Sequence, residues 1–148
     1  MKMKIDENLL KIKEAKFLSR FNGYSISPKS RYFFVIRKDL NEAEFFLFCL
    51  IWDVLADWDS RHLTFGAFEI NFDLLAYLLN WSVSKLRRVF KNLLNKGYLV
   101  QLSDNCYSVV GFELKKKFTK KSNEFNFYSE YKKMINNFEN KNVENNQK

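Results

Sequence analysis

Apolar residues spaced three and four positions apart predict helices along most of the chain. Residues 5–21 carry such a stripe, and Asn22 followed by Gly23 is typical of a helix C-terminus. Asn41 is a good capping residue for the next helix, which includes residues 45–58. That stretch is apolar on almost every side up to Ala56, which is typical of a helix buried in the centre of a domain.

Two shorter helices follow, joined by a tight turn. Asn71 is a capping candidate for residues 72–79, and Asn80 tolerates the left-handed backbone that a short connection needs. Ser82 or Ser84 can begin the second helix, which Gly97 ends. The expected buried side of that helix consists of Val83, Leu86, Phe90, Leu93 and Leu94.

Aromatic and β-branched runs predict the strands. Residues 31–36 favour a short strand, and residues 63–70 favour an extended turn with another. Residues 98–102 and 106–112 flank the polar turn 103–105, so they predict a β-hairpin. The expected fold class is therefore mainly α with a small β-hairpin.

Three regions follow from these patterns. We expect an N-terminal amphipathic helix within 1–24, a central domain at 31–114, and a C-terminal segment at 115–148. The last segment begins with a basic run, has a helical pattern at 124–138, and ends in residues 139–148, which are too polar to fold alone.

Composition narrows the function classes. The 148 residues carry a net charge of +8, with 47% apolar and 18% aromatic residues. Two cysteines and one histidine argue against a disulfide framework and a metal centre, so no metal or cofactor is expected. No run resembles a signal peptide or a membrane span, which indicates a soluble, cytoplasmic protein.

The charge is unevenly placed along the chain. Residues 1–30 carry +4, residues 31–60 carry −3, residues 61–97 carry +4 and residues 98–148 carry +3. A basic surface that binds a polyanion would explain why the charge changes sign from one segment to the next. Codon bias toward lysine and asparagine in an AT-rich genome explains the net charge equally well.

The order helix, short strand, helix, tight turn, helix, hairpin describes a winged helix–turn–helix. Residues 75–99 resemble the signature of that DNA-binding family over their whole length, with Leu75, Leu79, Leu86 and Phe90 at packing positions. Asn80, Trp81 and Leu94 depart from the usual residues. More loosely, residues 31–102 resemble the N-terminal domains of plasmid replication initiators and phage replisome organisers.

The resemblance implies sequence-specific binding of double-stranded DNA by a transcriptional regulator or a replication-initiation factor of a plasmid or phage. Independently, the second motif helix lacks acids from Val83 to Gly97. Arginine and asparagine can read base edges in the major groove, while lysine and serine suit phosphates. The candidate DNA-binding residues are Ser82, Ser84, Lys85, Arg87, Arg88, Lys91, Asn92 and Asn95, of which Ser84, Lys85 and Arg88 are expected nearest the bases.

The hairpin tip, the basic run and the flanking helices can each be interpreted in more than one way. The hairpin tip, Ser103 to Asn105, has no cation. The basic run could supply phosphate contacts or could be a solvated linker; its lysines are Lys115, Lys116, Lys117, Lys120 and Lys121. The two flanking helices could cover the domain's own core or form a homodimer interface, and we expect a homodimer.

Two further functions compete with duplex binding. Trp81, the hairpin tip without a cation and the aromatic-rich segment 125–138 would suit a winged-helix protein-interaction module, such as a phage-encoded inhibitor of a host protein. Exposed aromatics would suit RNA or single strands. An enzyme is not expected, because His62 has no convincing nucleophile and the acids Asp53, Asp57 and Asp59 lack a further ligand.

Overall fold

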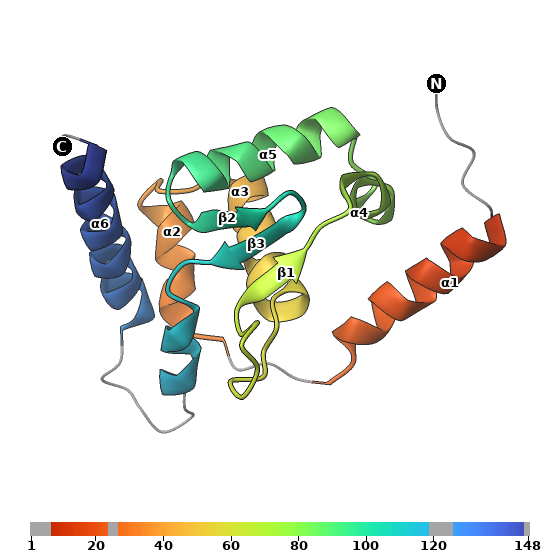
Figure 1. Ribbon diagram of the computed structural model, residues 1–148, viewed down its shortest axis with the longest axis horizontal. Coiled ribbons are helices and arrows are strands. Elements are labelled where there is room, and N and C mark those ends of the chain that lie inside the picture. The colour runs from red at the N-terminus through yellow and green to blue at the C-terminus, as the bar shows by residue number, and fades with distance from the viewer. Residues whose placement is uncertain (1–6, 24–26, 119–125, 147–148) are drawn as a thin grey trace.

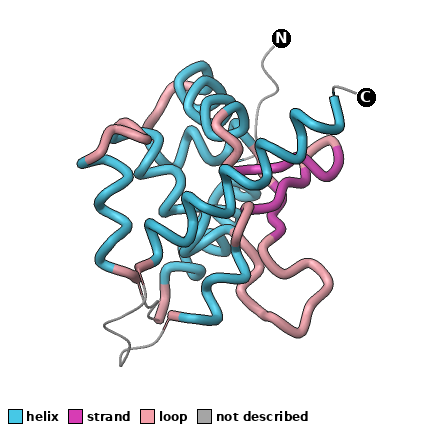
Figure 2. The backbone as a smooth tube through the Cα atoms, turned by 90° about the vertical axis from the view of Figure 1, so that its left-hand side faces the viewer, coloured by secondary structure: helices cyan, strands magenta, loops and turns pink. Residues whose placement is uncertain are grey.

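A computed structural model describes residues 7–23, 27–118 and 126–146 (Figure 1). The fold is mainly helical with a small antiparallel sheet of three strands, as the sequence predicted at this level. Helices fill most of the body, and the strands gather at one edge (Figure 2). The helices are α1 (Glu7–Leu18), α2 (Phe33–Ile36), α3 (Glu42–Leu50), α4 (Phe72–Leu79), α5 (Val83–Asn95) and α6 (Phe127–Asn146); the strands are β1 (Ala67–Glu69), β2 (Leu99–Ser103) and β3 (Cys106–Val109).

Shorter helical turns join these elements. Three 3₁₀ segments cover Ser19–Phe21, Lys29–Tyr32 and Phe112–Lys117, and Ile51–Leu55 continues α3 as one turn of π-helix. The helical regions expected at 5–21, 72–79 and 124–138 are therefore confirmed where the structure describes them. The helix expected at 45–58 is confirmed only as far as Leu55, because the backbone of Ala56 is extended.

The predicted capping residues all make their expected hydrogen bonds. Asn41 forms a capping box with Glu44, in which each side chain accepts from the other residue's backbone N–H. The Asn71 side chain accepts from the Leu74 N–H and begins α4. Asn80 ends that helix with a left-handed backbone, φ 57°. Such caps satisfy backbone groups that have no partner inside the helix.

The predicted hairpin is β2 and β3, and β1 joins it as the third strand. β3 lies in the middle, so the strand order is β1-β3-β2. Phe68 of β1 is in register with Tyr107 of β3, and their rings stack with centroids 6.0 Å apart. The sheet thereby presents aromatic side chains to the core beneath α5.

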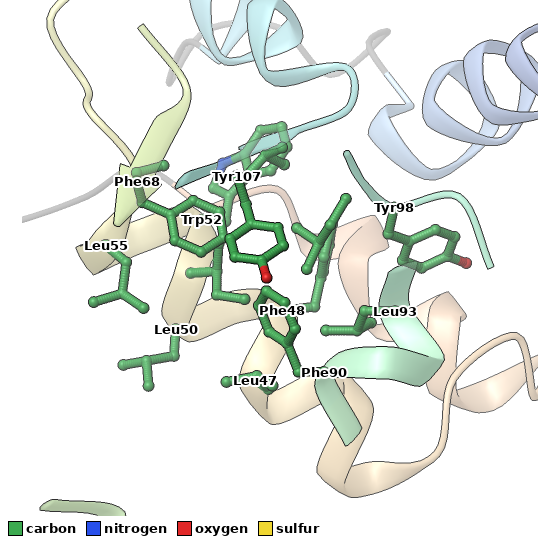
Figure 3. Packing of buried hydrophobic residues seen from close by; sticks show 14 of the residues in the cluster. Leu47, Phe48, Leu50, Trp52, Leu55, Phe68, Phe90, Leu93, Tyr98 and Tyr107 are labelled. Atoms are coloured by element: carbon green, nitrogen blue, oxygen red, sulfur yellow. The ribbon is translucent and has the colours of Figure 1, made fainter. Parts of the chain in front are cut away.

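The core is built mainly of aromatic rings around α3. Phe48 is fully buried, and Trp52 on the following turn is almost so (Figure 3). The Trp52 ring lies 4.7 Å from Phe112 and 5.3 Å from Phe127, so α3 contacts both the segment after the sheet and α6. The expectation of a central buried helix is confirmed.

The strand expected at residues 31–36 was wrong. This segment forms a 3₁₀ turn followed by α2. Strand propensity measures how a side chain packs on a pleated surface, and no strand lies beside this segment. A helical turn instead places the Phe34 ring in the core, 4.9 Å from Tyr128, and leaves Tyr32 and Ile36 exposed.

The two flanking helices differ in how they pack. On α6, Phe127, Tyr131 and Ile135 are buried in the same core as α3. On α1, Phe17 packs against that core, but Ile12 remains 65% exposed and Leu18 50% exposed. α6 continues to Asn146, so the expectation that residues 139–148 lack structure was wrong for the described part of that segment.

No helix in the described ranges is both long and apolar enough to cross a bilayer.

Candidate nucleic-acid interface

The exposed side of α5 is fixed by the apolar residues on its other side. Leu86, Val89, Phe90 and Leu93 are buried, and Phe90 contacts Tyr107 of the sheet at 4.7 Å between ring centroids. Val89 was missing from the expected buried set, whereas Val83 and Leu94 are only half-buried. The helix is therefore held against the sheet and α3 with one side left to solvent, at the top of Figure 1.

Three exposed cations lie on this outer side. Arg87, Arg88 and Lys91 are all exposed, and the acid-free sequence places no carboxylate beside them within the helix. Among the described residues, Arg88 and Lys91 have no ion-pair partner. Their charges are thus available to an anion, since nothing in the described structure neutralises them.

Two cations near the start of α5, Lys85 and the exposed Arg87, lie over aromatic rings. The Arg87 guanidinium carbon is 4.5 Å from the centre of the Phe72 ring, and Lys85 Nζ is 4.3 Å from the centre of the Trp81 ring. Such contacts are worth about 0.5–1 kcal/mol at exposed sites and restrict the side chain without neutralising it. Sequence reasoning missed the role of Trp81, although the spacing of four residues to Lys85 is the spacing of helix neighbours.

The polar candidates divide into two groups. Ser84 and Asn95 are exposed on the outer side. The Ser82 hydroxyl oxygen accepts from the Lys85 N–H at 3.1 Å and so serves as the helix cap. Asn92 was expected to face outward, but it is half-buried and hydrogen-bonds Glu44, so its orientation was wrongly predicted.

The Glu44 carboxylate ties the end of α5 to the start of α3. It is 2% exposed and lies 2.7 Å from Lys96 Nζ, which also donates to the backbone carbonyl of Asp39 at 3.0 Å. Burial raises the pKa of Glu44, but hydrogen bonds from Lys96 and Asn41 outweigh it, so the pKa is lowered. Glu44 therefore stays ionised and anchors α5 from the side that faces α3.

The hairpin tip offers hydrogen-bonding groups but no cation. Gln101 Nε2 donates to the carbonyls of Ser103 and Asp104 at 3.2 Å and 3.3 Å, so the turn is held by its own strand. The Asn105 carbonyl accepts from the Ile70 N–H at 3.1 Å, which keeps the tip close to the start of α4. The tip lies beside the body of the protein.

The basic run lies far from α5. Lys115, Lys116 and Lys117 belong to the 3₁₀ segment at the bottom of Figure 1, whereas α5 is at the top. Lys116 Nζ lies 5.3 Å from the Phe65 ring centre, and Lys115 is half-buried beside Phe112. Lys120 and Lys121 fall outside the described residues. The structure does not bring the described lysines of this run together with the exposed face of α5.

The residues considered for catalysis are engaged in local contacts. Asp57 accepts from Thr64 and lies 2.9 Å from His62 Nδ1. The hydrogen bond from Thr64 is the main cause that lowers the pKa of Asp57 to about 2, and Asp57 in turn raises the pKa of His62. Asp53 pairs with Arg31 at 3.2 Å. Across the described part of the chain, no group of three acidic, histidine or cysteine side chains could hold a metal ion.

Comparison with known proteins adds no relative: no family model, curated protein or solved structure matches the chain.

Proposed function

We propose that the chain is a winged helix–turn–helix protein that binds double-stranded DNA through α5. The single observation that carries this proposal is the exposed face of α5, where Arg87, Arg88 and Lys91 lie without a neighbouring acid on the helix. An α-helix fits the major groove of B-DNA, and a helix with cations and no acids on its outer side suits the phosphates that border that groove.

The order of elements supports the same proposal. Helix α3, strand β1, helices α4 and α5, and the hairpin β2–β3 follow one another, and β1 pairs with β3. In a winged helix–turn–helix, α4 and α5 would be the two motif helices and the hairpin would be the wing. The left-handed Asn80 permits the close approach of α4 to α5.

The exposed residues suggest a division of roles. Arg88 has no partner among the described residues and lies in the middle of α5, where it can hold a guanine edge with two hydrogen bonds. Ser84 and Lys85 lie one turn earlier and would be closest to neighbouring bases. Arg87 and Lys91 are proposed to contact phosphates. The biological output would be regulation of transcription or initiation of replication on a plasmid or phage.

A mobility-shift titration with random-sequence duplexes tests the proposal. Selection of the bound duplexes from the pool should yield a preferred sequence. The double variant Arg87→Ala with Arg88→Ala should lose most of its affinity, because two of the exposed cations are removed. The matched control Lys29→Ala with Lys133→Ala removes the same charge from exposed positions outside α5 and should bind nearly as the unchanged chain does.

Two outcomes would count against the proposal. Unchanged duplex affinity of the Arg87 and Arg88 variant would exclude α5 as the binding helix. A preference for single strands over the matching duplex would favour recognition through exposed aromatic rings instead.

A protein-interaction module is the second candidate function. The observation that favours it is an aromatic pair at the surface, the exposed Phe46 on α3 and the half-buried Trp81 before α5, with ring centroids 5.8 Å apart. Aromatic residues of this kind are enriched at the centres of protein interfaces. Purification of a stoichiometric complex with a protein partner would favour this candidate if the chain has no specific affinity for duplex DNA. The substitution Phe46→Ser should then abolish the complex, and Arg88→Ala should leave it intact.

A further inference from the structure

A groove of about 400 Å³ lies between α1 and the body of the protein. One wall is α1 and the 3₁₀ turn after it, and the other is formed by the end of β1 and by α4, on the right side of Figure 1. The floor is apolar. The apolar residues that line the groove are Phe17, Leu55, Ile70, Leu74, Leu75 and Leu78.

Three cations line the α1 wall of this groove. Lys13, Lys16 and Arg20 are spaced by three and four residues, which places them on one side of the helical segment. All three side chains are exposed, and none has an ion-pair partner within the described ranges. Glu69 is the single acid that lines the groove.

This arrangement is electrostatically unfavourable in an empty groove. Like charges three or four residues apart on a helix repel one another and destabilise it. An anion between the cations would relieve that repulsion and gain charge-assisted hydrogen bonds. Asn105 also lines the groove, and an amide side chain can donate to an anion.

We propose that the groove binds a small organic anion with an apolar body, such as an aliphatic or aromatic carboxylate. The cations would hold the acid group, and the leucine-rich floor would cover the hydrocarbon. The volume lies within the range of about 300–1,000 Å³ that is usual for small-molecule sites. The site is separate from the exposed face of α5, so this proposal does not depend on duplex binding.

The apolar floor distinguishes this ligand from a nucleic acid. A phosphodiester backbone would gain contacts with Lys13, Lys16 and Arg20 but nothing from Leu74 or Leu78. A molecule with both an acid group and a hydrocarbon part can contact the cations and the apolar floor at the same time. The free energy gained on burying apolar surface grows with the area buried, so the floor can supply much of the affinity.

Fluorescence titration with anilinonaphthalene sulfonate, an aromatic sulfonate, tests the proposal on the full chain. We expect saturable binding of one probe per chain, with competition by decanoate. Decanol lacks the acid and acetate lacks the hydrocarbon, so neither should displace the probe at the same concentration. Displacement by decanol as effective as by decanoate would overturn the proposal, because the cations would then have no role.

Substitutions of the lining cations test whether the probe binds in this groove. The triple variant Lys13→Gln, Lys16→Gln and Arg20→Gln should weaken probe binding about tenfold or more, since three charge contacts are lost. The triple variant Lys11→Gln, Lys29→Gln and Lys133→Gln is the matched control, because it removes the same charge from exposed cations that do not line the groove. Thermal unfolding of each variant checks that it is folded. Equal probe binding by the triple variant would overturn the proposal.

Duplex affinity of the same variants separates this proposal from the function of α5. We expect the triple variant to retain specific duplex binding while it loses the probe. The reverse result, loss of duplex binding in a chain that never bound the probe, would overturn the ligand site and assign these cations to phosphates.

Discussion

At the scale of single residues, Glu44 has two roles that its sequence position alone does not reveal. Its carboxylate closes the capping box of α3 with Asn41 and also pairs with Lys96 beyond the end of α5. A buried carboxylate is tolerated only where hydrogen bonds and an opposite charge replace its hydration. Glu44 thus joins the helix at the centre of the core to the helix proposed to meet DNA.

Replacing Glu44 separates these roles. Glu44→Gln can still accept the hydrogen bond from the Asn41 N–H but cannot pair with a cation, whereas Glu44→Ala loses both. We expect a loss of about 1–3 kcal/mol in unfolding free energy for Glu44→Ala and a smaller loss for Glu44→Gln. Urea denaturation of both variants measures this order, and equal stability of Glu44→Ala and the unchanged chain would contradict it.

The same residue gives the protein a predicted sensitivity to acid. The pKa of Glu44 in the folded state is below its ordinary value of 4.5. Its contribution to stability is therefore full above that value and is lost as the pH falls through the lower, folded-state pKa. The stability difference between the unchanged chain and Glu44→Gln should shrink over this acidic range in urea titrations. A difference that stays constant there would refute this linkage.

Gly111 is a residue at which an added methyl group should destabilise the fold. Its φ of +77° disfavours other residues, and an added Cβ would lie 3.0 Å from the Tyr131 ring of α6. We expect Gly111→Ala to cost about 1–3 kcal/mol in thermal or urea unfolding. Gly23→Ala is the control, since its φ is +90° but the space around it is open. Equal effects of the two substitutions would exclude the contact with Tyr131 as a cause.

At the scale of elements, the two flanking helices α1 and α6 contribute differently to the stability of the fold. α6 inserts Tyr131 into the core, with its ring 5.6 Å from both Phe34 and Phe48. We expect Tyr131→Ala to cost about 3–5 kcal/mol, as for other large aromatic side chains removed from a core. On α1, Ile12→Ala should change stability by less than about 0.5 kcal/mol, because Ile12 is largely exposed. Urea unfolding measures both, and similar losses would contradict this distinction.

Local sequence rules predicted the elements well where a side chain acts on its own backbone. Asn41, Asn71 and Ser82 begin helices because their side chains accept from nearby N–H groups, which needs no distant partner. The spacing of apolar residues likewise predicted α4 and α5, and the aromatic and β-branched runs on either side of a polar turn predicted the two hairpin strands. The outer face of α5 followed from the same spacing, which is why most of its candidate residues are exposed.

The wrong predictions concern segments whose structure is determined by contacts with residues far away in the sequence. The segment 31–36 is helical because Phe34 fills a space made by α3 and α6, and its own residues do not reveal this. Asn92 turns toward Glu44, which is 48 positions away in the chain. The groove beside α1 was not predicted at all, because it depends on how α1 lies against β1 and α4.

At the scale of the whole molecule, the structure explains why the acidic middle segment does not cancel the basic surface. Most of its acids have partners of their own: for example, Asp39 pairs with Lys132 at 2.7 Å, and Glu44 with Lys96 at the same distance. The exposed cations of α1 and α5 have no such partners within the described chain. Both helices therefore add positive charge to the surface that the acids of the middle segment do not neutralise.

The predicted homodimer would double the number of phosphate contacts. The apolar residues of α6 from Phe127 to Ile135 are occupied in the core, so α1 is the flanking helix with exposed apolar residues. If each copy makes about three to four contacts, the logarithm of the binding constant should fall with the logarithm of salt concentration with a slope of roughly −3 for one copy and −6 or steeper for two. Sedimentation equilibrium of the free chain fixes which slope to expect, and a slope near zero would contradict binding through phosphates.

The salt dependence also separates the roles proposed for neighbouring arginines. Arg87→Ala should weaken binding to all duplexes alike and reduce the slope by about one per copy, because a phosphate contact is lost. Arg88→Ala should leave the slope closer to that of the unchanged chain but relax the preference at one base pair, at a cost of about 1–3 kcal/mol on the preferred duplex. Titrations of both variants on the preferred duplex and on one changed at a single base pair, each at several salt concentrations, measure these effects. Equal slopes and equal loss of preference for the two variants would show that α5 does not present Arg87 and Arg88 to different parts of the groove.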